Sequence, residues 1–170
     1  MIMAQELTAQ DIQQMKEELH HRRTVEFPKL IEAVKEARAF GDLSENFEYK
    51  AAKMELNKCK RRIRYLETTI GSARVISDDS AEDEVGLFDK VTVTIPSMGD
   101  KSMTYQLVTS MRADALQGRI TRESPVGKAL FGHREGDIVH VQVSADFGYD
   151  MEILEIEKLQ DDGSIRINAF

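Results

Sequence analysis

Seven residues between positions 49 and 70 recur at alternating intervals of three and four. Such heptad spacing predicts a helix whose apolar seam packs against a second helix. The seam consists of Tyr49, Ala52, Leu56, Cys59, Ile63, Leu66 and Ile70. Because the spacing continues over so long a stretch, it predicts one arm of an elongated hairpin rather than part of a compact bundle.

The partner helix is expected in residues 10–40, which are almost all good helix formers. Pro28 is the only strong breaker in this stretch, and it predicts a kink or a change of helical register. Two helices of about 30 residues joined by a short turn should pack antiparallel in a hairpin about 45 Å long. The expected partner seam is Ile12, Met15, Leu19, Leu30, Ala33, Ala37 and Phe40.

The second half of the chain has a different pattern. Residues 71–86 are small, polar and acidic and are typical of a linker. The stretches KVTVTIP, MTYQLVTS, DIVHVQVS and YDMEILEIEKL then alternate with the period of two that predicts strands. Between them, ESPVGKALFG predicts a short helix with Ser124 as its N-cap. The expected fold class is α+β, with an antiparallel coiled-coil hairpin over residues 1–76 and a small domain with an antiparallel sheet over 77–170.

Composition narrows the class of protein. The single cysteine, Cys59, excludes an internal disulfide and a multi-cysteine zinc site. No histidine has partners at metal-ligand spacing, no apolar run approaches the ~18 residues of a membrane span, and the first ten residues do not resemble a signal peptide. We therefore expect a cytoplasmic protein without a membrane partner and without a tightly bound metal or cofactor. We also expect a monomer, although composition does not determine the oligomeric state.

Charge is distributed unevenly. Residues 1–76 hold 14 Lys and Arg against 12 Asp and Glu, whereas residues 77–170 hold 9 against 18. An acidic chain is a poor candidate for non-specific duplex binding, which depends on neutralising phosphates. Within the first half, the run KCKRRIR, residues 58–64, gathers five cations. It is interpreted either as a solvated helix face or as a basic strip that contacts an acidic protein or a nucleic-acid backbone.

The stretch between the two helices, ARAFGDLSENFEYKAAK, carries two carboxylates in D-x-x-E spacing. One interpretation is a capping box, in which Asp42 accepts from an amide of the second helix and Glu45 reaches back. The other is a tip, residues 41–46, whose carboxylates bind Mg²⁺ through oxygen ligands. Two carboxylates are too few to hold Mg²⁺ tightly alone, so such a tip would complete a site that belongs to a partner.

The same stretch resembles the tip motif of the Gre family of bacterial transcript cleavage factors, and within that family the GreA type. The family pattern is close to A-R-x-x-G-D-L-x-E-N-x-E-Y-x-A-A-[RK], and the likeness continues in LTAQDIQQMKEEL, IGSARVI and SPVGKALFGHREGD. The resemblance covers residues 7 to about 158. It implies a coiled coil followed by an FKBP-like domain, in a factor that enters the secondary channel of RNA polymerase and stimulates the polymerase's own cleavage of backtracked RNA. Such a factor is not an enzyme by itself.

The resemblance also implies roles for particular residues at the tip. Asp42 and Glu45 would help to bind the second catalytic Mg²⁺ of the polymerase, with Ser44 and Asn46 supporting the water or the RNA. Arg38 and Lys53 would form a basic patch on the 3′ end of the extruded RNA. Lys53 stands where the family often has arginine, so a planar fork is lost while the charge is kept.

The resemblance places the polymerase contact of the C-terminal domain at one segment. Two stretches depart from the family pattern, SADFGYDMEI and the extension QDDGSIRINAF. The docking residues it implies are Ser124, Pro125, Gly127 and Lys128. Two alternatives remain open: a Gre-like paralogue that occupies the channel and inhibits the polymerase, and a coiled-coil adaptor with no polymerase partner. A prolyl isomerase is disfavoured because fold alone does not confer function.

Overall fold

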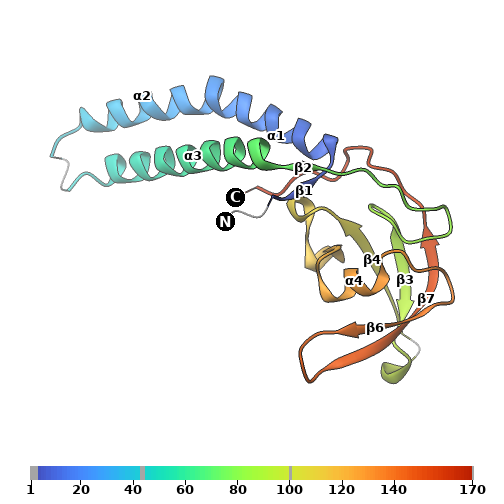
Figure 1. Ribbon diagram of the computed structural model, residues 1–170. Coiled ribbons are helices and arrows are strands. Elements are labelled where there is room, and N and C mark those ends of the chain that lie inside the picture. Colours follow the sequence, from blue (N-terminus) through green and yellow to red (C-terminus); the bar gives the residue numbers. More distant parts are fainter. Residues whose placement is uncertain (1–3, 43–44, 100, 170) are drawn as a thin grey trace. The chain divides into compact units, whose positions relative to one another are not determined.

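The computed structural model describes residues 4–42, 45–99 and 101–169. The chain divides into two compact units, one built on Asp11–Arg74 and the other on Glu6–Gln10 together with Val75–Ala169 (Figure 1). The sequence placed all of residues 1–76 with the hairpin. In the structure Glu6–Gln10 instead belongs to the second unit, where the amide of Ile76 donates to the carbonyl of Leu7 at 2.9 Å.

The first unit is a helical hairpin. Its first arm runs through α1 (Ala9–His21), the π-helical turn η1 (Arg22–Glu26) and α2 (Phe27–Arg38), and its second arm is α3 (Phe47–Ser72), which lies beside α2 (Figure 1). The π turn ends at Glu26, two residues before Pro28, and the amide of Phe27 donates to the carbonyl of Arg22. Because proline offers no amide hydrogen, a change of hydrogen-bond register is expected beside it, and the π turn is that change.

The heptad seam of the second arm is turned away from solvent along its whole length. Tyr49, Cys59 and Leu66 are buried, and the other four seam residues are half-buried. The first arm follows its pattern less well. Phe40, expected on the seam, is 77% exposed. The reason is that α2 ends at Arg38, so Phe40 is no longer carried on the helical face.

A polar layer crosses the middle of the hairpin. The guanidinium of Arg62, 3% exposed, donates to both carboxylate oxygens of Glu18 at 2.9 and 2.7 Å, and Arg22 donates to Glu18 and Glu26 at 2.7 Å each. Burial alone would raise the pKa of Glu18, but the hydrogen bonds from Arg62 and Arg22 lower it below its ordinary value. Such layers fix the register of paired helices.

The second unit is a small α+β fold around a five-stranded sheet. The strands are β3 (Lys90–Thr94), β4 (Ser102–Val108), β5 (Arg119–Thr121), β6 (Ile138–Gln142) and β7 (Gly148–Glu157). Their order in the sheet is β5-β4-β3-β7-β6. All pairs are antiparallel except β4 with β5, which is parallel, and β3 has a bulge at Thr92/Val93 against β7. A helix, α4 (Pro125–Leu130), packs against β6. The expected fold class is confirmed. Outside this sheet, β1 (Glu6–Leu7) pairs with β2 (Arg74–Val75). The 3-10 turns are η2 (Pro96–Met98), η3 (Ser110–Arg112) and η4 (Ala115–Gln117).

The core of this unit lies under the sheet, where alternate strand residues point inward, as the period of two requires. It is made of the buried side chains of Val85, Val91, Val93, Ile95, Leu107, Leu130, Val139, Val141, Met151 and Ile153. No helix in the described part of the chain is long and apolar enough to cross a membrane.

The C-terminal extension is fastened to its own unit. Asp161 accepts two hydrogen bonds, at 2.6 and 2.8 Å, from the fully buried guanidinium of Arg112. That guanidinium also lies 4.9 Å from the ring centroid of Phe88. The amide of Asn168 donates to the carbonyl of Met111 at 2.7 Å. Burial would raise the pKa of Asp161, but the Arg112 hydrogen bonds outweigh it and lower that pKa.

Candidate functional site

One asparagine at the tip makes hydrogen bonds to both arms of the hairpin. The side-chain oxygen of Asn46 accepts from the amide of Tyr49 at 2.9 Å, which makes Asn46 the N-cap of α3. Its amide nitrogen donates to the carbonyl of Ala37 in the first arm at 2.6 Å. Between these points the chain turns at Gly41, whose φ of 133° favours glycine. One side chain therefore both starts α3 and ties it to α2.

This geometry tests the capping-box interpretation of the tip carboxylates. The capping box with Asp42 as N-cap is wrong, because α3 begins at Phe47 and Asn46 satisfies its first turn. Asp42 and Glu45 both precede the N-cap and are exposed. Ser44 lies outside the described residues. The two carboxylates are thus presented to solvent at the end of the hairpin rather than used to start the second helix.

A basic and aromatic cluster lies next to the tip. The guanidinium carbon of Arg38 lies 5.5 Å and the ammonium of Lys53 5.8 Å from the ring centroid of Tyr49. Arg38 also donates to the Tyr49 hydroxyl at 3.4 Å. That hydrogen bond, together with the positive charge of Lys53, lowers the pKa of Tyr49 below its ordinary value. Both predicted basic residues, one from each arm, are therefore held on a single ring.

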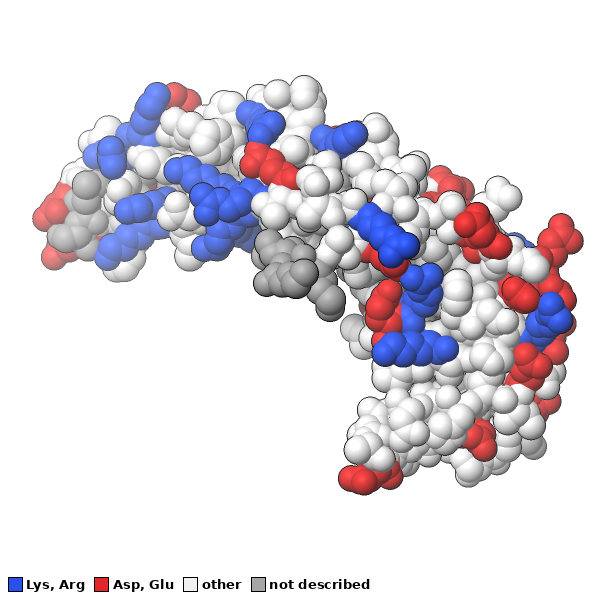
Figure 2. All heavy atoms as spheres, viewed as in Figure 1, with Lys and Arg blue, Asp and Glu red and all other residues white. Residues whose placement is uncertain are grey.

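Figure 2 shows acidic side chains at the far end of the hairpin and basic ones gathered behind them. The run KCKRRIR contributes to this charge only in part. Arg62 is buried in the polar layer, whereas the other four cations of the run are exposed. Arg62 therefore lies neither on a solvated helix face nor on a basic contact strip. It is buried inside the hairpin, where it bonds to Glu18.

Two exposed carboxylates set a limit on metal binding. Mg²⁺ takes about six oxygen ligands in octahedral geometry. Over the described ranges of the chain, no group of three or more His, Cys, Asp or Glu side chains could hold a metal ion. Asp42 and Glu45 suit a hard cation in charge and atom type, but they supply only part of a coordination shell. The donor set fits an ion that is shared with another molecule.

Three aromatic or basic residues at the tip were given no functional role from the sequence. Phe40 and Phe47 are 77% and 81% exposed. The ammonium of Lys50 lies 5.6 Å from the ring centroid of Phe47. The available signal was the position of two phenylalanines immediately on either side of the acidic motif, in AFGD and ENFE.

The expected docking segment lies at the start of α4. The Ser124 hydroxyl accepts from the amide of Gly127 at 3.1 Å and donates to the carbonyl of Thr121 at 2.7 Å. Pro125 is the first residue of the helix, as predicted. A Cβ on Gly127 would lie 1.9 Å from the Thr121 carbonyl oxygen. Ser124 and Gly127 therefore have structural tasks of their own, and Lys128 is exposed.

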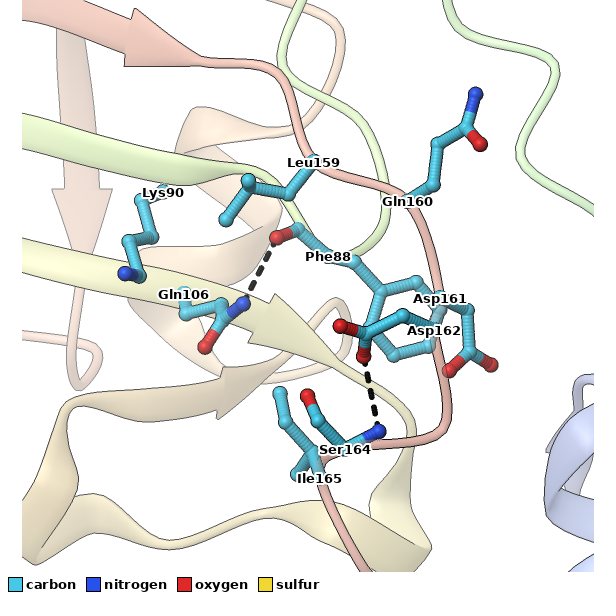
Figure 3. Close-up of a pocket in the computed structure, with 9 residues that line it drawn as sticks. All are labelled: Phe88, Lys90, Gln106, Leu159, Gln160, Asp161, Asp162, Ser164 and Ile165. Carbon is cyan, nitrogen blue, oxygen red and sulfur yellow. Dashed lines mark hydrogen bonds between the residues drawn. The ribbon is translucent and has the colours of Figure 1, made fainter.

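A cavity of about 300 Å³ lies beside the C-terminal extension in the second unit (Figure 3). Its polar groups largely satisfy one another. The Gln106 amide donates to the carbonyl of Phe88 at 2.9 Å, and the amide of Ser164 donates to the Asp162 carboxylate at 2.8 Å.

Comparisons with known proteins agree with these two units. The family described as "Transcription elongation factor, N-terminal" matches residues 5–75, and "Transcription elongation factor, GreA/GreB, C-term" matches residues 79–158. Both units are therefore those of a transcription elongation factor. The chain belongs to the GreA/GreB family.

Individual relatives cover most of the chain. "Transcription elongation factor GreA" of Streptococcus gordonii is 40% identical over 154 residues, and that of Streptococcus pneumoniae 39%; each alignment covers 89% of this chain and 94% of the relative. Among solved structures, that of the transcription factor Gfh1 has 25% identity and a TM-score of 0.46, covering 93% of this chain and 100% of its own. A GreA/GreB factor from Nitrosomonas europaea has 17% identity and a TM-score of 0.40, covering 91% and 98%.

Proposed function

We propose that this protein enters the secondary channel of RNA polymerase and stimulates the polymerase to cleave backtracked RNA. The observation that carries the proposal is the pair of exposed carboxylates, Asp42 and Glu45, which precede the N-cap Asn46 at the end of a long hairpin. In this proposal the protein is not itself an enzyme. Its partners are the polymerase and the 3′ end of the nascent RNA, in the cytoplasm.

The magnesium ion would be held jointly. Asp42 and Glu45 would supply carboxylate oxygens from this chain, and the polymerase would supply the remaining ligands. A second metal ion in a phosphodiester-cleaving site activates water or stabilises the leaving oxygen. The incomplete donor set at the tip supports this division, since two carboxylates alone would not retain the ion.

The other tip residues have supporting roles in this proposal. Arg38 and Lys53 place two positive charges beside Tyr49, where they would attract the phosphates of the extruded RNA. Asn46 keeps the turn in register through its bonds to both arms. Because the carboxylates and the cations lie at the same end of the hairpin, the metal site and the RNA would be positioned together.

The second unit would supply most of the affinity for the polymerase. Exposed charges on the hairpin are individually worth little, since solvent and salt screen them. The start of α4, with Ser124, Pro125, Gly127 and Lys128, is the proposed contact. Its N-cap and its close packing against Thr121 would present that surface in one fixed conformation.

The proposal is tested on a backtracked elongation complex with end-labelled RNA. Addition of the full chain should raise the rate of RNA cleavage at least about tenfold over the polymerase alone at a given Mg²⁺ concentration. Raising Mg²⁺ should narrow the difference, because the tip carboxylates then matter less for ion capture. Binding without stimulation, or inhibition of both cleavage and elongation, would contradict the proposal and indicate the inhibitory paralogue instead.

A further inference from the structure

We propose that Phe40 and Phe47 form a stacking platform for the unpaired bases of the extruded RNA. The inference rests on the proposed function and adds to it a recognition element that is separate from the carboxylates and from the basic cluster. The first observation is exposure: in the part of the chain that the structure describes, these are the two most exposed aromatic side chains, at 77% and 81%. Exposure of an apolar ring to water is unfavourable in free energy unless a partner covers the ring.

The two phenylalanines lie at the same end of the hairpin, although they come from different sides of the turn. The amide of Phe40 donates to the carbonyl of Ala37 at 3.3 Å, and the side chain of Asn46 donates to that same carbonyl at 2.6 Å. Phe47 follows Asn46 directly and is the first residue of α3. The backbone of Phe40 and the side chain of Asn46, the residue before Phe47, therefore bond to a single carbonyl oxygen, and this brings the two phenylalanine positions to the same end of the hairpin.

Cations accompany the aromatic residues of the tip. The ammonium of Lys50 lies 5.6 Å from the centre of the Phe47 ring. Lys53 and Arg38 lie over the ring of Tyr49, two residues further along α3. Open aromatic faces that alternate with cations are the arrangement by which proteins bind single-stranded nucleic acid: the rings stack on bases and the cations meet the phosphates. A duplex would offer no free base faces to Phe40 or Phe47.

The charges at the tip also argue against a protein surface as the partner of these rings. Asp42, Glu45 and Glu48 are all exposed close to Phe40 or Phe47 in the sequence. An apolar protein pocket that covered the rings would have to remove water from these carboxylates, which is costly. Bases can stack on the rings from the solvent side while the carboxylates stay hydrated or bind a cation.

The test compares two complexes of the same polymerase, one backtracked with several extruded nucleotides and one not backtracked. Affinity of the full-length protein for each is measured by competition against a labelled wild-type chain. Phe40→Ala and Phe47→Ala should each weaken binding to the backtracked complex about tenfold, the scale of one lost base–aromatic stack. Binding to the complex without extruded RNA should be unchanged.

Two further variants separate stacking from apolar contact. Phe47→Leu keeps apolar bulk but loses the π face, so it should behave like Phe47→Ala, whereas Phe47→Tyr should retain wild-type affinity. Extruded RNA with abasic nucleotides should bind wild type and Phe47→Ala equally. Circular dichroism should show the same helix content in every variant, because both side chains are exposed.

The test distinguishes a failure of the stacking platform from a failure of the proposed function. Equal loss of affinity for both complexes would mean that the rings contact the polymerase, and it would overturn the inference while leaving the proposed function intact. Unchanged affinity for the backtracked complex in the double alanine variant would also overturn it. Absence of wild-type binding to either complex would refute the proposed function, and the stacking platform with it.

Discussion

The hairpin and the globular unit each contain one buried arginine held by a carboxylate, Arg62 by Glu18 and Arg112 by Asp161. Their candidate functional residues, however, are placed in opposite ways. At the hairpin tip, Asn46 rather than either carboxylate caps α3, and its side chain also bonds to the first arm. In the start of α4, candidate docking residues are themselves the cap and the packing contact. Function and stability should therefore be separable at the tip but coupled in α4.

The largest expected effect is in the globular unit. Asp161→Ala removes the carboxylate from a fully buried guanidinium, and breaking such a pair costs about 3 to 5 kcal/mol. Guanidinium chloride unfolding of the full chain at neutral pH measures the loss. Asp162→Ala is the matched control, since that neighbouring carboxylate is exposed and bonds locally to Ser164, and it should change stability by less than about 0.5 kcal/mol. Similar losses in both variants would rule out the buried pair as the main fastening of the extension.

The next effect contrasts two glycines. Gly127→Ala would force a methyl group against the Thr121 carbonyl and should destabilise α4 by about 1 to 3 kcal/mol. Gly71→Ala, in α3, meets nothing within 4 Å and should stabilise the hairpin by about 0.5 to 1 kcal/mol, since alanine favours the helix. Hydrogen exchange resolved by peptide measures each unit separately. If both substitutions raised the stability of their units, or both lowered it, the predicted contrast between the two glycines would be wrong.

A smaller effect is expected at the tip itself. Asn46→Ala removes the N-cap of α3 and its bond to the first arm, so the ends of both arms should exchange amide hydrogens faster, at a cost of about 1 kcal/mol. RNA cleavage should fall although both carboxylates remain, because their position is lost. Asn46→Asp keeps the acceptor for Tyr49 but not the donor to Ala37, and it should rescue the helix start without rescuing cleavage fully. Slow exchange in Asn46→Ala would show that the turn is held by other contacts.

The smallest effect is a pH dependence of the hairpin. The pKa of Glu18 is lower in the folded chain than its ordinary value of 4.5. Its contribution to stability is therefore fully present above that ordinary value and is lost as pH falls through the folded pKa. Helix melting followed between pH 6 and pH 3 should show a declining transition temperature, and Glu18→Gln should flatten the decline. An equally steep decline in Glu18→Gln would assign the effect to other carboxylates.

Much of the fold could be predicted because burial imposes a period. The 3–4 spacing of α3 and the alternation in the strands each determine which side chains face inward, and those side chains are buried or half-buried. The N-cap residue of α3 could not be predicted from such a period. Asp42 and Asn46 are equally good N-caps by type, and only the point at which the helix starts selects Asn46.

Other features depended on contacts between distant residues. Arg62 sits in a run of cations that is typical of a solvated face, yet its partner Glu18 lies 44 positions away and draws it inside. The Arg112–Asp161 pair spans 49 positions, and neither residue has a local signature. The exposure of Phe40 follows from the end of α2 at Arg38, and helix ends are the least predictable part of an element.

The most direct test of the central claim uses Asp42→Asn and Glu45→Gln, each of which removes one negative charge and keeps the shape of the side chain. Three quantities are measured for each variant: melting temperature, affinity for a backtracked polymerase complex, and RNA cleavage rate at limiting Mg²⁺. We predict that melting and binding stay at wild-type values, because Asn46 rather than Asp42 caps α3, while cleavage falls at least about tenfold and Mn²⁺ partly restores it. Wild-type cleavage in both variants would contradict a metal-binding role for the tip.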